Sequence, residues 1–182
     1  MRVLAGRLVV LAAAAALSGI VLAQPKSDWE IKLEEREWQE GEVKLPDFPK
    51  AENLIEFEAN LTSSFRFYVD SQSIDVGGGV VRYTLVGRSG SGTDNVSFNG
   101  LRCKTGEHKL YANGRTTDKA WVRVRESPWK VIEAKAYTRQ HLVLLRDFFC
   151  PGAVPIMTRA EGVDALKKGF HPYAISNHPP TR

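Results

Sequence analysis

The side chains that could support catalysis or metal binding are few in this chain, and their spacing fits none of the common sites. His108 alternates with Leu110 in a segment of strand-like pattern, and His141 lies on the apolar side of a helical pattern, so we predict a structural role for both. His171 and His178 flank a proline-rich tail and form no HExxH or similar ligand spacing. The sequence therefore predicts no catalytic residue, no metal site and no cofactor.

Two glycine-containing stretches resemble functional motifs only superficially. The stretch GRSGSG at 87–92 has Ser91 at the position where the nucleophile elbow G-x-S-x-G requires its second glycine. The three glycines at 77–79 precede a strand rather than a helix and cannot present helix amides to a phosphate, so we predict a hairpin turn there. Asp70 and Asp75 flank an earlier turn at 71–74, where aspartate commonly caps the backbone.

The segment KAWVRVR at 119–125 carries the pattern that most favours ligand binding. If Val122 and Val124 point into the core, the alternate residues of this strand point outward. Arginine beside an aromatic ring suits an anionic or glycan-bearing partner. The candidate binding site comprises Trp121, Arg123 and Arg125, and it extends to Arg82 and Arg102 if their strands are neighbours.

The arginine-rich strand is also compatible with roles that need no ligand. Charged residues on an exposed strand prevent edge-to-edge pairing with another sheet. The acidic segment 28–58 could cover the arginines, because residues 24–61 carry a net charge of −6 and residues 62–182 a net charge of +8. The two halves could instead face different partners, or both could simply be solvated.

The N-terminus has the features of a secretory signal peptide. Arg2 and Arg7 precede the uncharged stretch Leu8–Leu22, and a small-x-small pattern ends at Ala23. A retained membrane anchor is the alternative, but the apolar stretch is shorter than the ~20 residues that span a bilayer. We therefore predict cleavage after Ala23 and export to the periplasm, with extracellular release as the alternative, and no membrane span in the mature chain.

The mature chain is close to electrical neutrality. Removing Arg2 and Arg7 leaves 23 basic against 21 acidic residues. This balance lacks the strongly basic character of nucleic-acid-binding domains, so we predict no nucleic-acid partner.

Cys103 and Cys150 are the two cysteines of the chain. In an oxidising compartment they favour a single disulfide, which would close a loop of about 48 residues. No CxxC pattern or histidine cluster accompanies them, so the sequence fits neither a metal site nor a redox role.

The alternation of apolar and polar residues from 54 to 134 predicts closely spaced antiparallel strands. The alternation slips between Phe98 and Leu101, which predicts a β-bulge at Asn99-Gly100.

The pattern becomes helical in 137–150, and Pro151 would end that helix. The disulfide would then attach the end of this helix to the strand that carries Cys103. We predict an α+β fold, in which an antiparallel, meander-like β-sheet carries a packed C-terminal helix pinned by one disulfide.

A last short helix is predicted over 158–169, with Thr158 and Glu161 as a capping box and Gly169 as its end. The predicted organisation is a signal peptide (1–23), a polar lead segment (24–53), a β-rich domain with its packed helix (54–157), and a short helix with a loose tail (158–182).

Several stretches of the mature chain together resemble one known family. They are FYVDSQSIDVGGGVVRYTLVGRS, NVSFNGLRCKTGEHKLYANG, the tryptophans at 121 and 129, and LVLLRDFFCP. On these residues the chain is similar to the cryptic-neisserial-protein-like family of exported proteobacterial proteins, from about Asp28 to Pro151. It departs at Gly78-Gly79, where the family more often has Asp-Gly, and at Thr93-Asp94, where small or basic residues are usual.

The resemblance implies an envelope-exported domain with no established activity. A weaker similarity, to surface-adhesin-E-like domains, hints at a binding module. We therefore predict an exported, non-enzymatic binding or interaction module whose partner is an envelope protein, a glycan or an anionic ligand. The alternative is a small exported hydrolase whose active site is assembled from residues distant in sequence, and a purely structural role is not distinguished from binding. A deep pocket with a titratable pair and a base within hydrogen-bond reach would favour the hydrolase.

Overall fold

The computed structural model describes residues 38–59 and 65–174 of the 182-residue chain. The predicted signal peptide and residues 24–37 of the predicted lead segment lie outside the described residues. From Glu40 onward the described residues belong to one structural unit.

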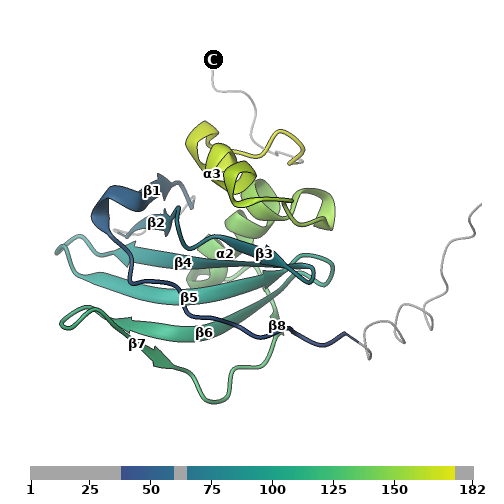
Figure 1. Ribbon diagram of the computed structural model, residues 1–182. Coiled ribbons are helices and arrows are strands. Elements are labelled where there is room, and N and C mark those ends of the chain that lie inside the picture. Colours follow the sequence, from purple (N-terminus) through teal and green to yellow (C-terminus); the bar gives the residue numbers. More distant parts are fainter. Residues whose placement is uncertain (1–37, 60–64, 175–182) are drawn as a thin grey trace, which may run out of the picture. The chain divides into compact units, whose positions relative to one another are not determined.

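An antiparallel sheet of eight strands lies at the centre of this unit (Figure 1). The strand order is β1-β2-β4-β5-β6-β7, with β3 pairing with the first half of β4 and β8 with the first residues of β6. The predicted meander of antiparallel strands is confirmed. The strands are β1 (Leu54–Phe57), β2 (Arg66–Asp70), β3 (Asp75–Gly77), β4 (Val80–Arg88), β5 (Asp94–Arg102), β6 (Glu107–Arg115), β7 (Ala120–Arg123) and β8 (Lys130–Val131).

Helical segments from the C-terminal part of the chain cover one face of the sheet (Figure 1). The segment predicted as one helix is a succession of short 3-10, α and π turns, and Pro151 begins the next turn after it. The helical elements are η1 (Ala51–Asn53), η2 (Ala136–Thr138), α2 (Arg139–Val143), η3 (Leu144–Phe149), η4 (Pro151–Ala153) and α3 (Arg159–Lys168).

The predicted disulfide is present and joins the sheet to this helical layer. Cys103, just after β5, is bonded to Cys150, just after η3, with an S–S distance of 2.00 Å. Both cysteines are buried in the main hydrophobic core. That core combines inward residues of the sheet with the helical layer, and its fully buried members include Val69, Val81, Tyr83, Leu101, Leu144 and Phe149. The α+β fold with its pinned helix is thereby confirmed.

The opposite face of the sheet is covered by residues 40–50, which we call the N-terminal strap. It runs across the strands as an extended segment (Figure 1). Val43 and Leu45 pack against the buried cluster around Phe98, and Phe48 packs against the cluster around Val86. The sheet is therefore buried on both faces rather than on one.

A β-bulge is present next to Asn99, as predicted, but the extra residue belongs to β6 and not to β5. β5 keeps an unbroken register with β4, whereas the pairing of β5 with β6 shifts between Phe98 and Asn99 and leaves Tyr111 of β6 as the extra residue. Because both faces are buried, β5 directs Phe98 toward the strap and Leu101 toward the helices without any slip. A Cβ at Gly100 would lie 2.5 Å from the Tyr111 hydroxyl oxygen, so glycine here makes room for that ring.

The local signals for turns and caps are confirmed. Gly78 and Gly79 have φ values of 61° and 78°, the left-handed conformation that a tight hairpin turn needs. The Thr158 hydroxyl accepts a hydrogen bond from the Glu161 amide at 3.2 Å, and Gly169 ends α3 with φ 84°.

The chain after α3 differs from the loose tail that the sequence predicts. His171 is buried, its amide donates to the Asp147 carbonyl at 2.7 Å, and its ring bonds the Glu161 carboxylate at 2.9 Å. The tail is therefore anchored as far as this histidine, and residues 175–182 lie outside the described residues.

Candidate functional site

The predicted tryptophan of the arginine-rich strand faces the protein interior. The indole of Trp121 packs against Phe48 and Phe98, with ring centroids 5.4 and 6.1 Å apart, and its Nε1 donates to the Pro46 carbonyl at 2.8 Å. Val122, which the candidate binding site required to point inward, is 48% exposed. The orientation on which that site depended is therefore not the one observed. The strap covers the face to which Trp121 points. Burying the indole removes more apolar surface from water than burying Val122 would, so this orientation of the strand is the more favourable one.

Arg82 lies under the strap rather than on an open surface. Its guanidinium donates to the Glu40 carboxylate at 3.3 Å and to Asp75 at 3.2 Å. The same Glu40 carboxylate accepts hydrogen bonds from Lys109 at 2.8 Å and from the Tyr111 hydroxyl. Burial raises the pKa of Glu40, but the hydrogen bonds from Lys109 and Tyr111 outweigh burial and hold the pKa below its usual value. The acidic strap thus neutralises this part of the basic sheet.

Of the other predicted arginines, only Arg102 lies beside Arg82, diagonally across the β4–β5 pair and on the same face. Arg102 is half-buried and pairs with Glu107 at 3.2 Å. Arg123 and Arg125 are exposed near the far edge of the sheet, and β5 and β6 separate their strand from β4. The structure therefore does not assemble the five predicted residues into a single binding site.

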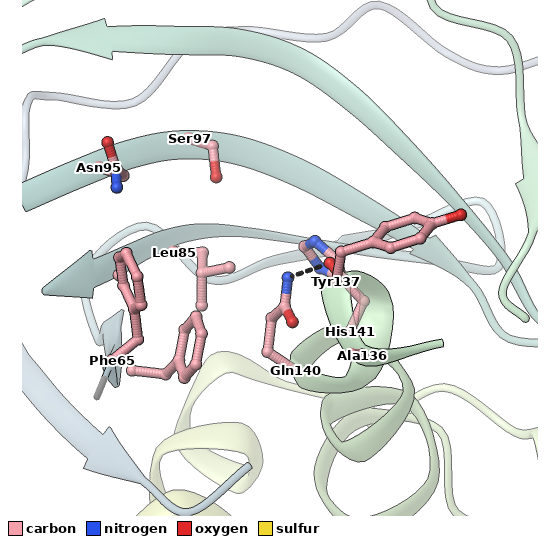
Figure 2. Close-up of a pocket in the computed structure, with 10 residues that line it drawn as sticks. Phe65, Leu85, Asn95, Ser97, Ala136, Tyr137, Gln140 and His141 are labelled. Carbon is pink, nitrogen blue, oxygen red and sulfur yellow. Dashed lines mark hydrogen bonds between the residues drawn. The ribbon is translucent and has the colours of Figure 1, made fainter. Parts of the chain in front are cut away.

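A cavity of about 550 Å³ lies instead on the helix-covered side of the sheet (Figure 2). Phe65, Phe67 and Leu85 form its apolar part, and the η2–α2 segment borders it with Tyr137 and Ala136. Its polar groups are Asn95 and Ser97 from β5, and Gln140 and His141 from α2. None of these described lining residues carries a formal charge at neutral pH.

Small residues on the central strands create this cavity. Gly87 of β4 lies between Phe67 of β2 and Asn95 of β5 in one cross-strand row, and a Cβ at Gly87 would come within 3.3 Å of the Phe67 ring. In the next row, Leu85 pairs with Ser97, whose side chain is too short to fill the space. The sheet therefore offers a hollow at the level where α2 crosses it.

Two stacked histidines stand at the polar end of the cavity. The rings of His108 and His141 have centroids 3.9 Å apart and an interplanar angle of 27°. His141 Nδ1 lies 2.7 Å from the Tyr83 hydroxyl, and His108 Nε2 lies 3.0 Å from Asn99 Oδ1. Burial raises the pKa of Tyr83 well above its usual value, so this hydroxyl stays protonated and shares one hydrogen bond with His141 Nδ1.

The partner of His108 fixes the tautomer of that ring. Because Asn99 Oδ1 can only accept, the neutral His108 ring carries its hydrogen on Nε2. The Tyr83 hydroxyl is able to donate to His141 Nδ1 or to accept from it and is compatible with both tautomers of that ring. Burial lowers the pKa of His108 to about 4. Burial is the main cause that lowers the pKa of His141 well below its usual value, and electrostatic repulsion from His108 lowers this pKa further. Both rings are therefore neutral at physiological pH.

The Nδ1 atom of His141 is bonded to the Tyr83 hydroxyl, and within the described residues neither a serine nor a carboxylate is bonded to this ring. Residues 38–59 and 65–174 also contain no group of three or more His, Cys, Asp or Glu side chains arranged to hold a metal ion. Over the same residues, none of the helices has the length and apolar character needed to cross a membrane.

The histidine pair predicts an acid sensitivity of folding. In the unfolded chain His108 binds a proton near pH 6.5, whereas in the folded protein it does so near pH 4. The unfolded state therefore binds more protons between these values, and stability is full above pH 6.5 and falls as the pH drops toward 4. We expect His108 alone to lower the free energy of unfolding by about 2 kcal/mol between pH 7.5 and pH 5.0.

Urea titrations at these two pH values check this expectation. The variant His108→Gln keeps a side-chain N–H for Asn99 but does not titrate, so its stability should change less between the two pH values. Equal pH dependence of the variant and the wild type would show that His108 is not protonated on unfolding.

The known proteins most informative for this chain come from one family. A family model described as the CNP1-like family matches residues 33–167. Cryptic neisserial protein 1 of Neisseria gonorrhoeae (strain ATCC 700825 / FA 1090) is 29% identical over 160 residues, which cover 79% of this chain and 78% of that protein. No solved structure shows significant similarity. Because the family model covers well over half of the sequence, this chain belongs to the CNP1-like family.

Proposed function

We propose that this chain is an exported cell-envelope protein that binds, without catalysis, a small molecule with a large apolar part. The observation that carries the proposal is the uncharged cavity between Phe65, Phe67 and Leu85 of the sheet and the η2–α2 segment (Figure 2). Its volume of about 550 Å³ falls within the ~300–1,000 Å³ that ligand sites commonly have.

The chemistry of the lining supports binding over hydrolysis. Aromatic and aliphatic side chains form one end, and amide, hydroxyl and imidazole groups form the other, which is the composition of a ligand pocket. The histidine that lines the cavity, His141, has Nδ1 bonded to the buried Tyr83, and burial lowers the pKa of this ring well below its usual value, which makes it a weak base.

Two features support export. The first 23 residues have the charge and apolar pattern of a signal peptide. The Cys103–Cys150 disulfide is of the kind that persists in oxidising compartments such as the periplasm.

Binding of a neutral apolar dye tests this function. Protein released from the periplasm by osmotic shock is titrated with N-phenyl-1-naphthylamine, whose fluorescence rises in apolar surroundings. We expect saturable binding with one site per chain. Asn95→Trp places a large ring at the cavity, because Asn95 is an exposed lining residue, and should weaken binding at least tenfold.

The matched control is Lys167→Trp. Lys167 is also exposed, but it lies on α3 and does not line the cavity. It should leave the affinity unchanged. Absence of saturable binding to the wild type, or equal loss in both variants, would overturn the proposed site. The mass of the released protein tests export separately, since cleavage after Ala23 leaves Gln24 as the first residue.

A further inference from the structure

A second cavity adjoins the first and has a different chemical character. Its volume is about 490 Å³, and it shares Tyr137 and His141 with the apolar cavity. These two residues form the ridge between the two spaces. Beyond the ridge the lining becomes charged, with Lys130, Glu133 and Lys135.

The charge balance of the second cavity leaves one cation available. Glu133 forms an ion pair with Lys135. Lys130 makes no ion pair within the part of the chain that the structure describes, and its side chain is exposed. In the pairing of β8 with β6, Lys130 lies directly opposite His108, so both side chains project from the same face of the sheet.

The two cavities together complement the polarity of an amphipathic anion. The first offers apolar surface without any charge, and the second offers an ammonium group next to it. We propose that the ligand is a long-chain carboxylate whose alkyl chain occupies the apolar cavity and whose carboxylate crosses the Tyr137–His141 ridge to reach Lys130. This inference rests on the proposed function and adds the chemical class of the ligand.

The alkyl chain should provide most of the affinity. Each methylene moved from water into an apolar site contributes about 0.8 kcal/mol, so the dissociation constant should fall about fourfold with each added methylene. Octanoate, decanoate and dodecanoate, used below their micelle concentrations, are therefore expected to displace N-phenyl-1-naphthylamine in that order of increasing affinity.

The carboxylate is tested by removing its partner. Lys130→Gln should weaken dodecanoate binding about three- to fivefold, the range of a partly exposed ion pair, and leave dodecanol binding unchanged. Raising the salt concentration should narrow the difference between variant and wild type for dodecanoate, because added ions screen the pair. Lys167→Gln is the matched control, since it removes one exposed lysine of α3, which does not line either cavity.

The outcomes separate this inference from the proposed function. If Lys130→Gln weakens dodecanoate selectively and Lys167→Gln does not, the carboxylate assignment is supported. If both compounds displace the dye and Lys130→Gln changes neither, the carboxylate assignment is overturned while the apolar cavity keeps its role. If the wild type binds neither the dye nor dodecanoate, both the assignment and the proposed function are overturned.

Discussion

Removal of the Cys103–Cys150 disulfide is expected to lower the free energy of unfolding by about 4 kcal/mol, because the bond closes a loop of about 48 residues in the unfolded chain. A loss of this size is a large part of the ~5–15 kcal/mol that stabilises a typical domain. The bond also fixes η3 to the end of β5. Its loss should therefore loosen the helical layer as well as destabilise the fold.

The double variant Cys103→Ala/Cys150→Ala tests this prediction without introducing a buried polar group. Urea unfolding at neutral pH gives the stability difference, and the slope of the transition shows whether the unfolded state has become more extended. Dye binding is the second readout, because α2 forms one wall of the apolar cavity and is continuous with η3. A stability loss below about 1 kcal/mol with unchanged dye binding would show that packing alone holds the helical layer in place.

The elements that were predicted correctly are those specified by neighbouring residues. The hairpin turn at Gly78-Gly79 needs a backbone conformation that glycine adopts readily, and the start of α3 needs only Thr158 and Glu161 three residues later. The disulfide was also predictable, because two cysteines in a chain that is predicted to be exported allow a single intramolecular pairing.

The errors arose where a distant segment decides which way a side chain points. Trp121 and Val122 are adjacent apolar residues, so the local pattern does not decide which of the two faces the core. The strap, about 75 residues earlier in the chain, selects the orientation that buries the indole. The bulge was placed in β5 for the same reason, since one-sided burial was assumed and Phe98 and Leu101 face two different buried layers.

The apolar cavity had no sequence signal strong enough to predict it. It results from the short side chains of Gly87 and Ser97 on adjacent strands and from the position at which α2 crosses them. His108 and His141 were predicted to have a structural role, but 33 positions separate them and nothing in their local patterns indicates that they stack. Contacts of this kind depend on strand order and helix placement together.

Glu40→Ala is expected to lower the free energy of unfolding by about 3–5 kcal/mol, the cost of leaving a buried charge without its partner. The side chains of Arg82 and Glu40 are only 7% and 12% exposed. Arg82 Nε already has no hydrogen-bond partner among the described residues, so removing Glu40 leaves the guanidinium with the exposed Asp75 as its remaining carboxylate there. Because the pKa of Glu40 is lowered in the folded state, its contribution is fully present at neutral pH and is lost as the pH falls below the usual carboxylate range.

The matched control for Glu40→Ala is Glu42→Ala, which removes an exposed carboxylate two residues along the same strap and should change stability by less than about 0.5 kcal/mol. Trp121 fluorescence is the structural readout, since the strap accepts the indole hydrogen bond at Pro46 and covers the ring. A red shift in Glu40→Ala before global unfolding would show that the carboxylate holds the strap against the sheet. Equal stability of the two variants, with unchanged fluorescence, would mean that the apolar contacts of Val43, Leu45 and Phe48 suffice to hold it and that the buried ion pair adds nothing.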